Sequence, residues 1–108
     1  MKSVIAIATI LLLGGAMLAD AADDAAAEAL LKKSKCLTCH SVDKKKDGPA
    51  YKEVAKKYAG KPDAEAKLYT HLTTHPEVEV DGKKEKHESL KTTDDKEIRN
   101  VISWILSR

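Results

Sequence analysis

The sequence predicts a small all-α domain of about four helices that follows a cleaved N-terminal leader. Three observations support this prediction: the chain has only 108 residues, its first 21 residues are mostly apolar or small, and later apolar residues recur at helical spacing. A chain of this length holds one small domain, which excludes a multidomain enzyme. Its net charge of +2 is too small to predict binding to nucleic acid.

Residues 1–21 have the pattern of a secretory signal peptide. Lys2 provides the positive start, a largely apolar run follows, and Ala19-Asp20-Ala21 offers small residues around a cleavage position. We therefore expect cleavage near Ala21 and export of residues 22–108. The alternative is an uncleaved leader that anchors the protein in a membrane, although the apolar run is shorter than the ~20 residues that a spanning helix needs.

Two helices are expected in the first half of the exported chain. The first opens at Asp23-Asp24 and runs to Lys35, with acids at its start and lysines at its end, as the helix dipole favours. A charged loop over residues 41–49 separates it from the second helix, which ends at Gly60. The second helix is indicated by apolar side chains at i, i+3, i+4 and i+7, namely Tyr51, Val54, Ala55 and Tyr58.

Two more helices are expected in the second half. Pro62 suits the first turn of the third helix, and Pro76 ends it. Its apolar residues are Ala66, Leu68, Tyr69 and Leu72. Asp94 and Glu97 form a capping pair for the last helix. One face of that helix carries Ile98, Val101, Ile102 and Ile105, with Trp104 beside them.

The segment between the last two helices, residues 76–92, shows no helical period. Val78 and Val80 alternate briefly before an Asp81-Gly82 turn signal, and the rest is rich in Lys and Glu. We expect no sheet here.

The residues that carry chemistry are Cys36-Leu37-Thr38-Cys39-His40, which contain the only two cysteines of the chain. Two thiols at this spacing, followed directly by a histidine, are the attachment pattern of a c-type haem. Each thiol can add to a vinyl group to form a thioether, and His40 then supplies an imidazole ligand to the iron. The motif predicts one covalently attached haem c held by Cys36, Cys39 and His40.

Three other interpretations of the motif are open. A redox-active Cys-x-x-Cys pair usually lies near a βαβ pattern, which this sequence lacks. A zinc site would need two further ligands, which His71 and His75 could offer. A simple disulfide would leave His40 without a role.

The apolar content favours the haem interpretation. The chain contains no Phe, one Trp and three Tyr, and so small a domain usually needs an additional stabilising element. Burial of a porphyrin would add the hydrophobic contact that the side chains lack. We therefore expect the chain without attached haem to be largely unfolded.

With these features the chain resembles a small bacterial class I c-type cytochrome over nearly all of residues 23–108. The likeness rests on the helix that leads into Cys36–His40, on Gly48-Pro49-Ala50-Tyr51, and on the final segment from Val101 to Ser107. It implies a cytochrome c-like fold in which the first and last helices cross, and a periplasmic single-electron carrier rather than an enzyme. It also implies that the Pro49 carbonyl orients His40, although Pro49 equally suits a first helical turn. The aromatic side chains expected in the haem pocket or between helices are Tyr51, Tyr58, Tyr69 and Trp104.

The sequence departs from this family at the sixth iron ligand. The family usually supplies a methionine from a loop before the last helix, but Met1 and Met17 are the only methionines here and both lie in the leader. His87 lies in the corresponding segment and is the expected ligand, with His75 and His71 as alternatives. Because His71 and His75 are spaced i, i+4, they share a face of the third helix, where such pairs usually bind nothing.

The sixth ligand determines the expected function. Two imidazoles predict a low-potential electron carrier, because methionine as a ligand raises the potential. The alternative is a haem protein that binds a gas or another small molecule at a vacant or displaceable sixth position, which a mobile charged loop around His87 would permit. A peroxidase is disfavoured, since Arg99 and Arg108 are the only arginines.

Lysines occur in groups, several of which flank the haem motif in the sequence. A positive rim around the haem edge would attract acidic redox partners. The alternative is a solvated surface whose charge is offset by the acidic residues. The groups are Lys32-Lys33-Lys35, Lys44-Lys45-Lys46, Lys52-Lys56-Lys57 and Lys83-Lys84-Lys86.

Overall fold

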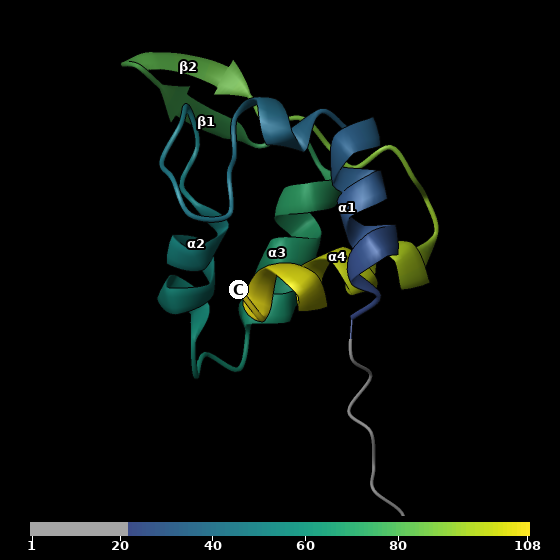
Figure 1. The fold of residues 1–108 in the computed structure, drawn as a ribbon. Coiled ribbons are helices and arrows are strands. Elements are labelled where there is room, and N and C mark those ends of the chain that lie inside the picture. The colour runs from purple at the N-terminus through teal and green to yellow at the C-terminus, as the bar shows by residue number, and fades with distance from the viewer. Residues whose placement is uncertain (1–21) are drawn as a thin grey trace, which may run out of the picture.

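The computed structural model describes residues 22–108, so the leader predicted for residues 1–21 lies outside the described part. These residues form four α-helices, one short 3-10 helix and a two-stranded hairpin, whose arrangement is drawn in Figure 1. The helices are α1 (Asp24–Lys33), α2 (Tyr51–Tyr58), α3 (Ala64–Thr73) and α4 (Asp95–Leu106); the 3-10 helix η1 covers Cys36–Thr38, and the strands are β1 (Glu77–Val80) and β2 (Lys83–Lys86). The four predicted helices are confirmed. None of the described helices has the length and apolar character needed to cross a bilayer.

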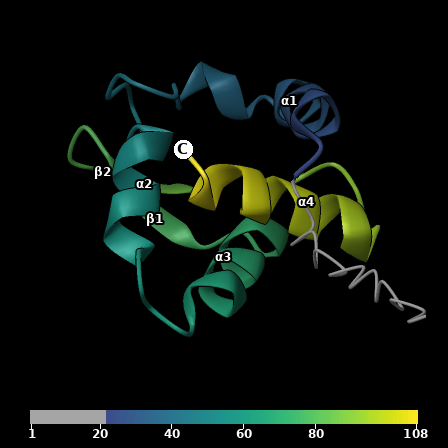
Figure 2. The same cartoon turned by 60° about the horizontal axis from the view of Figure 1, so that its bottom comes forward.

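Helix α4 is the centre of the packing. It contacts α1, α2 and α3, and Figure 2 shows it between α1 on one side and α3 on the other. The helix begins where it does because the Asp94 carboxylate accepts hydrogen bonds from the backbone N–H groups of Lys96 and Glu97, as an N-cap residue does. The predicted apolar face is buried as expected, and it comprises Ile98, Val101, Ile102, Trp104 and Ile105.

The Glu97 side chain does not take part in the predicted cap by binding the Asp94 backbone directly. The Glu97 carboxylate accepts a hydrogen bond from the Thr92 hydroxyl at 2.7 Å. The backbone N–H of Asp94 donates to that same hydroxyl oxygen at 3.1 Å. Thr92 therefore stands between the two groups that a capping box would pair directly.

Helices α1 and α4 are joined at the start of α1. Asp23 caps α1 through its side chain, which accepts from the backbone N–H of Ala26. Its backbone forms two hydrogen bonds with the Asn100 side chain on α4, one at 2.8 Å and one at 3.0 Å. Ala27 is fully buried in the shared core, and its small side chain permits close approach of the two helices.

Helix α1 ends two residues earlier than predicted, at Lys33 rather than Lys35. The backbone of Lys35 is left-handed, with φ of 61°, and a residue in this conformation ends a helix. No residue pattern predicts this early end, because glycine or asparagine usually occupies such a position and lysine is a good helix former.

The expectation that residues 76–92 contain no sheet is wrong. Strands β1 and β2 form an antiparallel hairpin in which Glu77 is opposite Lys86 and Val80 is opposite Lys83. Asp81 and Gly82 both have positive φ, 51° and 76°, as a two-residue type I′ turn requires. The Asp-Gly signal was therefore sufficient to form the turn, although the strands on either side are short and mostly charged.

The packing of α4 predicts a specific loss of stability. Ile102 is 1% exposed, so we expect Ile102→Ala to lower the free energy of unfolding by about 2–5 kcal/mol, since truncation leaves a cavity. The adjacent exposed residue provides the control, and Ser103→Ala should change it by less than about 0.5 kcal/mol. Denaturant unfolding of the haem-loaded proteins measures both values; equal effects would contradict this assignment of the core.

Candidate functional site

Both cysteines lie in one tight turn directly after α1. The left-handed Lys35 redirects the chain, and the carbonyl of Cys36 then accepts hydrogen bonds from the backbone N–H groups of Cys39 and His40. Both thiols are free and half-buried. The turn therefore presents two thiols and an imidazole from five successive residues.

The environment of Cys36 argues against a redox-active thiol pair. Burial raises the pKa of the Cys36 thiol to about 11, and the charges of Cys39 and Glu88 add to the effect. A redox-active cysteine instead needs a lowered pKa, so that the thiolate forms at neutral pH. Thioether attachment makes no such demand on the finished site, because the alkylated sulfur has no proton to lose.

His40 is oriented by the loop that follows it. Its Nδ1–H donates a hydrogen bond to the carbonyl oxygen of Pro49 at 2.7 Å. Because a carbonyl can only accept, the proton is on Nδ1, and Nε2 is left with a free lone pair. A metal-binding histidine is commonly fixed through its other nitrogen in this way. Pro49 thus occupies the position that the family resemblance implied.

Gly48 makes this arrangement sterically possible. Its backbone N–H donates to the Cys39 carbonyl at 2.7 Å, which brings the loop against the His40 ring. A Cβ atom at position 48 would lie 2.5 Å from His40 Cε1, which is closer than two non-bonded carbon atoms approach. The sequence pointed to Gly48 as part of the family resemblance, but its close contact with the His40 ring depends on the tertiary structure.

Tyr51 and Trp104 continue the site into the core. The Tyr51 ring stacks on His40 with 5.0 Å between ring centroids, and the Trp104 ring meets Tyr51 edge-on at 5.4 Å. Burial raises the pKa of the Tyr51 hydroxyl, and nearby Cys36 and Cys39 add to the shift. The other two tyrosines, Tyr58 and Tyr69, are half-buried and pack against the edge of the core.

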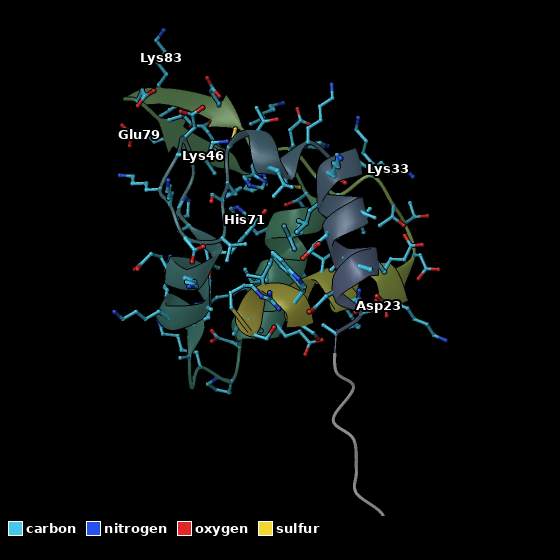
Figure 3. All side chains as sticks on the ribbon, in the orientation of Figure 1. Asp23, Lys33, Lys46, His71, Glu79 and Lys83 are labelled. Atoms are coloured by element: carbon cyan, nitrogen blue, oxygen red, sulfur yellow. The ribbon has the colours of Figure 1, made fainter. Side chains whose placement is uncertain are left out.

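The histidines considered as sixth ligands occupy different positions. The His87 ring lies 6.0 Å from the His40 ring and 4.3 Å from the His71 ring, measured between centroids. Figure 3 labels His71 on α3, near the middle of the view. His75 is exposed, and its Nδ1–H donates to the backbone carbonyl of His87 at 3.1 Å. The structure therefore brings His40, His71 and His87 together and directs His75 toward the backbone of His87.

Burial shifts both inner imidazoles toward the neutral form. It is the main cause of the lowered pKa of His87, to which the charges of His71 and His40 contribute. The pKa of His71 is also lowered, first by burial and then by His40 and Lys57. A neutral imidazole has the lone pair that a metal requires.

The described residues fit a haem c better than a bare metal ion. Within residues 22–108, no three His, Cys, Asp or Glu side chains converge as ligands for a metal ion. In the same range, two buried side-chain polar atoms have no hydrogen-bond partner, His87 Nδ1 and Trp104 Nε1. Two free thiols, a pre-oriented imidazole and two unsatisfied polar atoms beside them are compatible with a bound cofactor that carries both a metal and polar groups.

Comparison with known proteins identifies the family. The family model described as cytochrome c matches residues 25–108. The chain belongs to the cytochrome c family. Members of this family bind one covalently attached haem c with its iron. The resemblance to a small class I c-type cytochrome is thereby confirmed.

The family includes relatives of known structure. The chain is similar to the class 1 cytochrome MtoD from Sideroxydans lithotrophicus ES-1, with 46% identity and a TM-score of 0.77 over 81% of this chain and 97% of that one. Wild-type cytochrome c552 from Nitrosomonas europaea is 30% identical, with a TM-score of 0.58 over 74% of this chain and 96% of that chain.

Curated relatives match over shorter segments. Cytochrome c-551 of Pseudomonas aeruginosa is 48% identical over 58 residues, which is 54% of this chain and 56% of that protein. Cytochrome c2 of Rhodocyclus tenuis is 60% identical over 40 residues, 37% of this chain and 44% of that protein. The chain thus matches about half the length of these two relatives.

The contact between Gly48 and His40 predicts the effect of one methyl group. We expect Gly48→Ala to push the His40 ring away from the Pro49 carbonyl, which should weaken iron ligation by His40 and change the optical spectrum of the ferric protein. Asp47→Ala, at the exposed neighbouring position, is the matched control and should leave the spectrum unchanged. An optical spectrum of each haem-loaded protein measures the effect, and a spectrum of Gly48→Ala that matches the wild type would contradict the assigned packing.

Proposed function

We propose that this cytochrome is a single-electron carrier of low reduction potential, with one haem c attached through Cys36 and Cys39 and with His40 and His87 as iron ligands. When bound, the haem supplies an iron that takes up and releases one electron. The single observation that carries the proposal is the separation of the two imidazoles.

That separation suits two ligands of one metal. Each metal–imidazole nitrogen bond is about 2 Å long, and the ring centre lies about 1 Å beyond the nitrogen, so two rings on opposite sides of one ion have centroids about 6 Å apart. The His40 and His87 centroids are 6.0 Å apart. His71 and His87, at 4.3 Å, are too close together for such a pair.

The chemistry of the remaining residues supports the same assignment. Residues 22–108 contain no methionine, the usual sixth ligand of the family. His87 is half-buried, and its Nδ1 has no hydrogen-bond partner among the described residues. His75 is instead exposed, whereas the His87 ring lies beside the His40 ring. These observations favour His87 over His75 and His71 as the second ligand.

Replacement of His87 tests the ligand. We expect His87→Ala to convert the ferric protein from low-spin to largely high-spin and to let the ferrous protein bind carbon monoxide. His87→Met should restore a low-spin state at a higher reduction potential, because thioether sulfur favours ferrous iron. Optical spectra and a redox titration measure both effects. An unchanged low-spin spectrum in His87→Ala would exclude His87 as the ligand.

The same spectra test the second candidate function, a haem protein that binds a gas or another small molecule. A wild-type protein that is high-spin, or that binds carbon monoxide as readily as His87→Ala, would favour that function over electron transfer. The exposed hairpin that precedes His87 is the feature that favours it, since all four residues of β2 are exposed.

We propose that the redox partners are acidic proteins that approach the haem motif. Leu37 is the one large apolar side chain that is exposed among the described residues, at 39%, and it lies between the two cysteines. Lys46 donates from Nζ to the Leu37 carbonyl at 3.0 Å, which places a positive charge beside the motif. The lysines within four positions of Leu37 or Lys46 include Lys33, Lys35, Lys44 and Lys45. Figure 3 labels Lys33 and Lys46 on the upper part of the molecule.

We also propose that residues 1–21 are removed and that the protein acts in the periplasm. The positive start, apolar run and small residues of the leader support this proposal.

Charge reversal tests the lysine surface formed by Lys33, Lys35 and Lys44–Lys46. Lys46→Glu should slow oxidation of the ferrous protein by anionic ferricyanide about three- to tenfold at low ionic strength and leave it little changed at high salt. With cationic hexaammineruthenium as reagent, the direction should reverse. Lys67→Glu, on the first half of α3, is the charge-matched control. Stopped-flow kinetics measure the rates, and equal effects of the two variants would support a surface without a docking role.

A further inference from the structure

The backbone of His87 is held on both sides by the residues that follow α3. Its N–H donates to the Pro76 carbonyl at 2.8 Å. Its carbonyl accepts the hydrogen bond from His75 Nδ1 at 3.1 Å. His75 and Pro76, which are consecutive, therefore bind the carbonyl and the N–H of His87.

A second attachment lies shortly after His87. The backbone N–H of Leu90 donates to the carbonyl of Leu72 on α3 at 2.9 Å. The N–H of Lys91 donates to the hydroxyl of Ser34 at 2.8 Å, and Ser34 is completely buried at the end of α1. The segment from His87 to Lys91 is thus fixed to both helices that border the site.

The hairpin itself contributes little to this placement. Its two strands project from the helices at the top of Figure 1, and its acidic and basic residues face solvent. A two-stranded hairpin is marginally stable by itself in water. The position of His87 therefore depends on the bonds at the base of the hairpin, where the His75 side chain donates a hydrogen bond to the His87 backbone.

We propose that His75 is a positioning residue for the sixth iron ligand: by binding the His87 carbonyl, it closes the base of the hairpin and keeps the His87 imidazole beside His40. The inference rests on the proposed function, in which His87 is a ligand. It gives the two histidines spaced i, i+4 separate tasks, since His71 contacts the His87 ring and His75 holds its backbone.

A matched pair of substitutions separates the hydrogen bond from the bulk of the side chain. His75→Asn retains an N–H donor at the same place, because Nδ2 of asparagine and Nδ1 of histidine are both bonded to Cγ. His75→Leu has a similar branched shape without a donor. Neither change alters the imidazoles of His40, His71 or His87.

The experiment measures how readily the sixth ligand leaves the iron in the haem-loaded protein. Cyanide binding to ferric iron requires the sixth position to open, so its rate at saturating cyanide reports that opening. We expect His75→Leu to accelerate binding about three- to tenfold, the effect of one net hydrogen bond on an equilibrium. His75→Asn should stay within about twofold of wild type, and exchange of the His87 amide hydrogen should accelerate in the leucine variant alone.

Each alternative outcome identifies what fails. Equal cyanide rates in the wild type and His75→Leu, or equal rates in the leucine and asparagine variants, would overturn the positioning role while leaving His87 as ligand. An unchanged low-spin spectrum in His87→Ala would overturn the proposed function and this inference with it. If exchange of the His87 amide hydrogen were then still faster in His75→Leu alone, His75 would hold the His87 backbone without positioning an iron ligand.

Discussion

The packing of α4 against the other three helices determines where the cysteine motif and His40 lie. It joins α1, which leads into the cysteine motif, to α2, which begins directly after the Gly48-Pro49 loop. It also supplies Trp104, which packs on Tyr51, and Tyr51 in turn stacks on His40. Trp104 and Tyr51 are almost completely buried, so a shift of α4 would be transmitted to the His40 imidazole.

Hydrogen bonds of the backbone then specify how the imidazoles are presented. Pro49 supplies the carbonyl that defines the tautomer of His40, and Gly48 allows that carbonyl to come close. His87 is presented differently, because its backbone is held and its Nδ1 has no partner among the described residues. His40 is thus fixed through its ring, and His87 is fixed through its main chain.

The fold was predictable to the extent that its signals are local. Apolar spacing and cap residues located all four helices, since these depend on neighbours within one or two turns. The errors arose where a short signal competed with composition: Asp81-Gly82 formed a hairpin among charged residues that suggested none. At Lys35, the backbone is left-handed although lysine favours helix. Thr92 entered the cap of α4 because a loop residue outside the helix was within reach.

The sequence by itself determined the cofactor chemistry, because Cys36, Cys39 and His40 are adjacent in the chain and their spacing defines the attachment pattern. It also left residues 22–108 without a methionine and made His87, His75 and His71 the candidate histidines for the sixth ligand. Only the tertiary structure decided which of these lies near His40 and what surrounds it. His87 is 47 positions from His40 along the chain, and at such a separation, proximity depends on how helices pack and where a loop is anchored. No local sequence pattern encodes the packing of the helices or the anchoring of that loop.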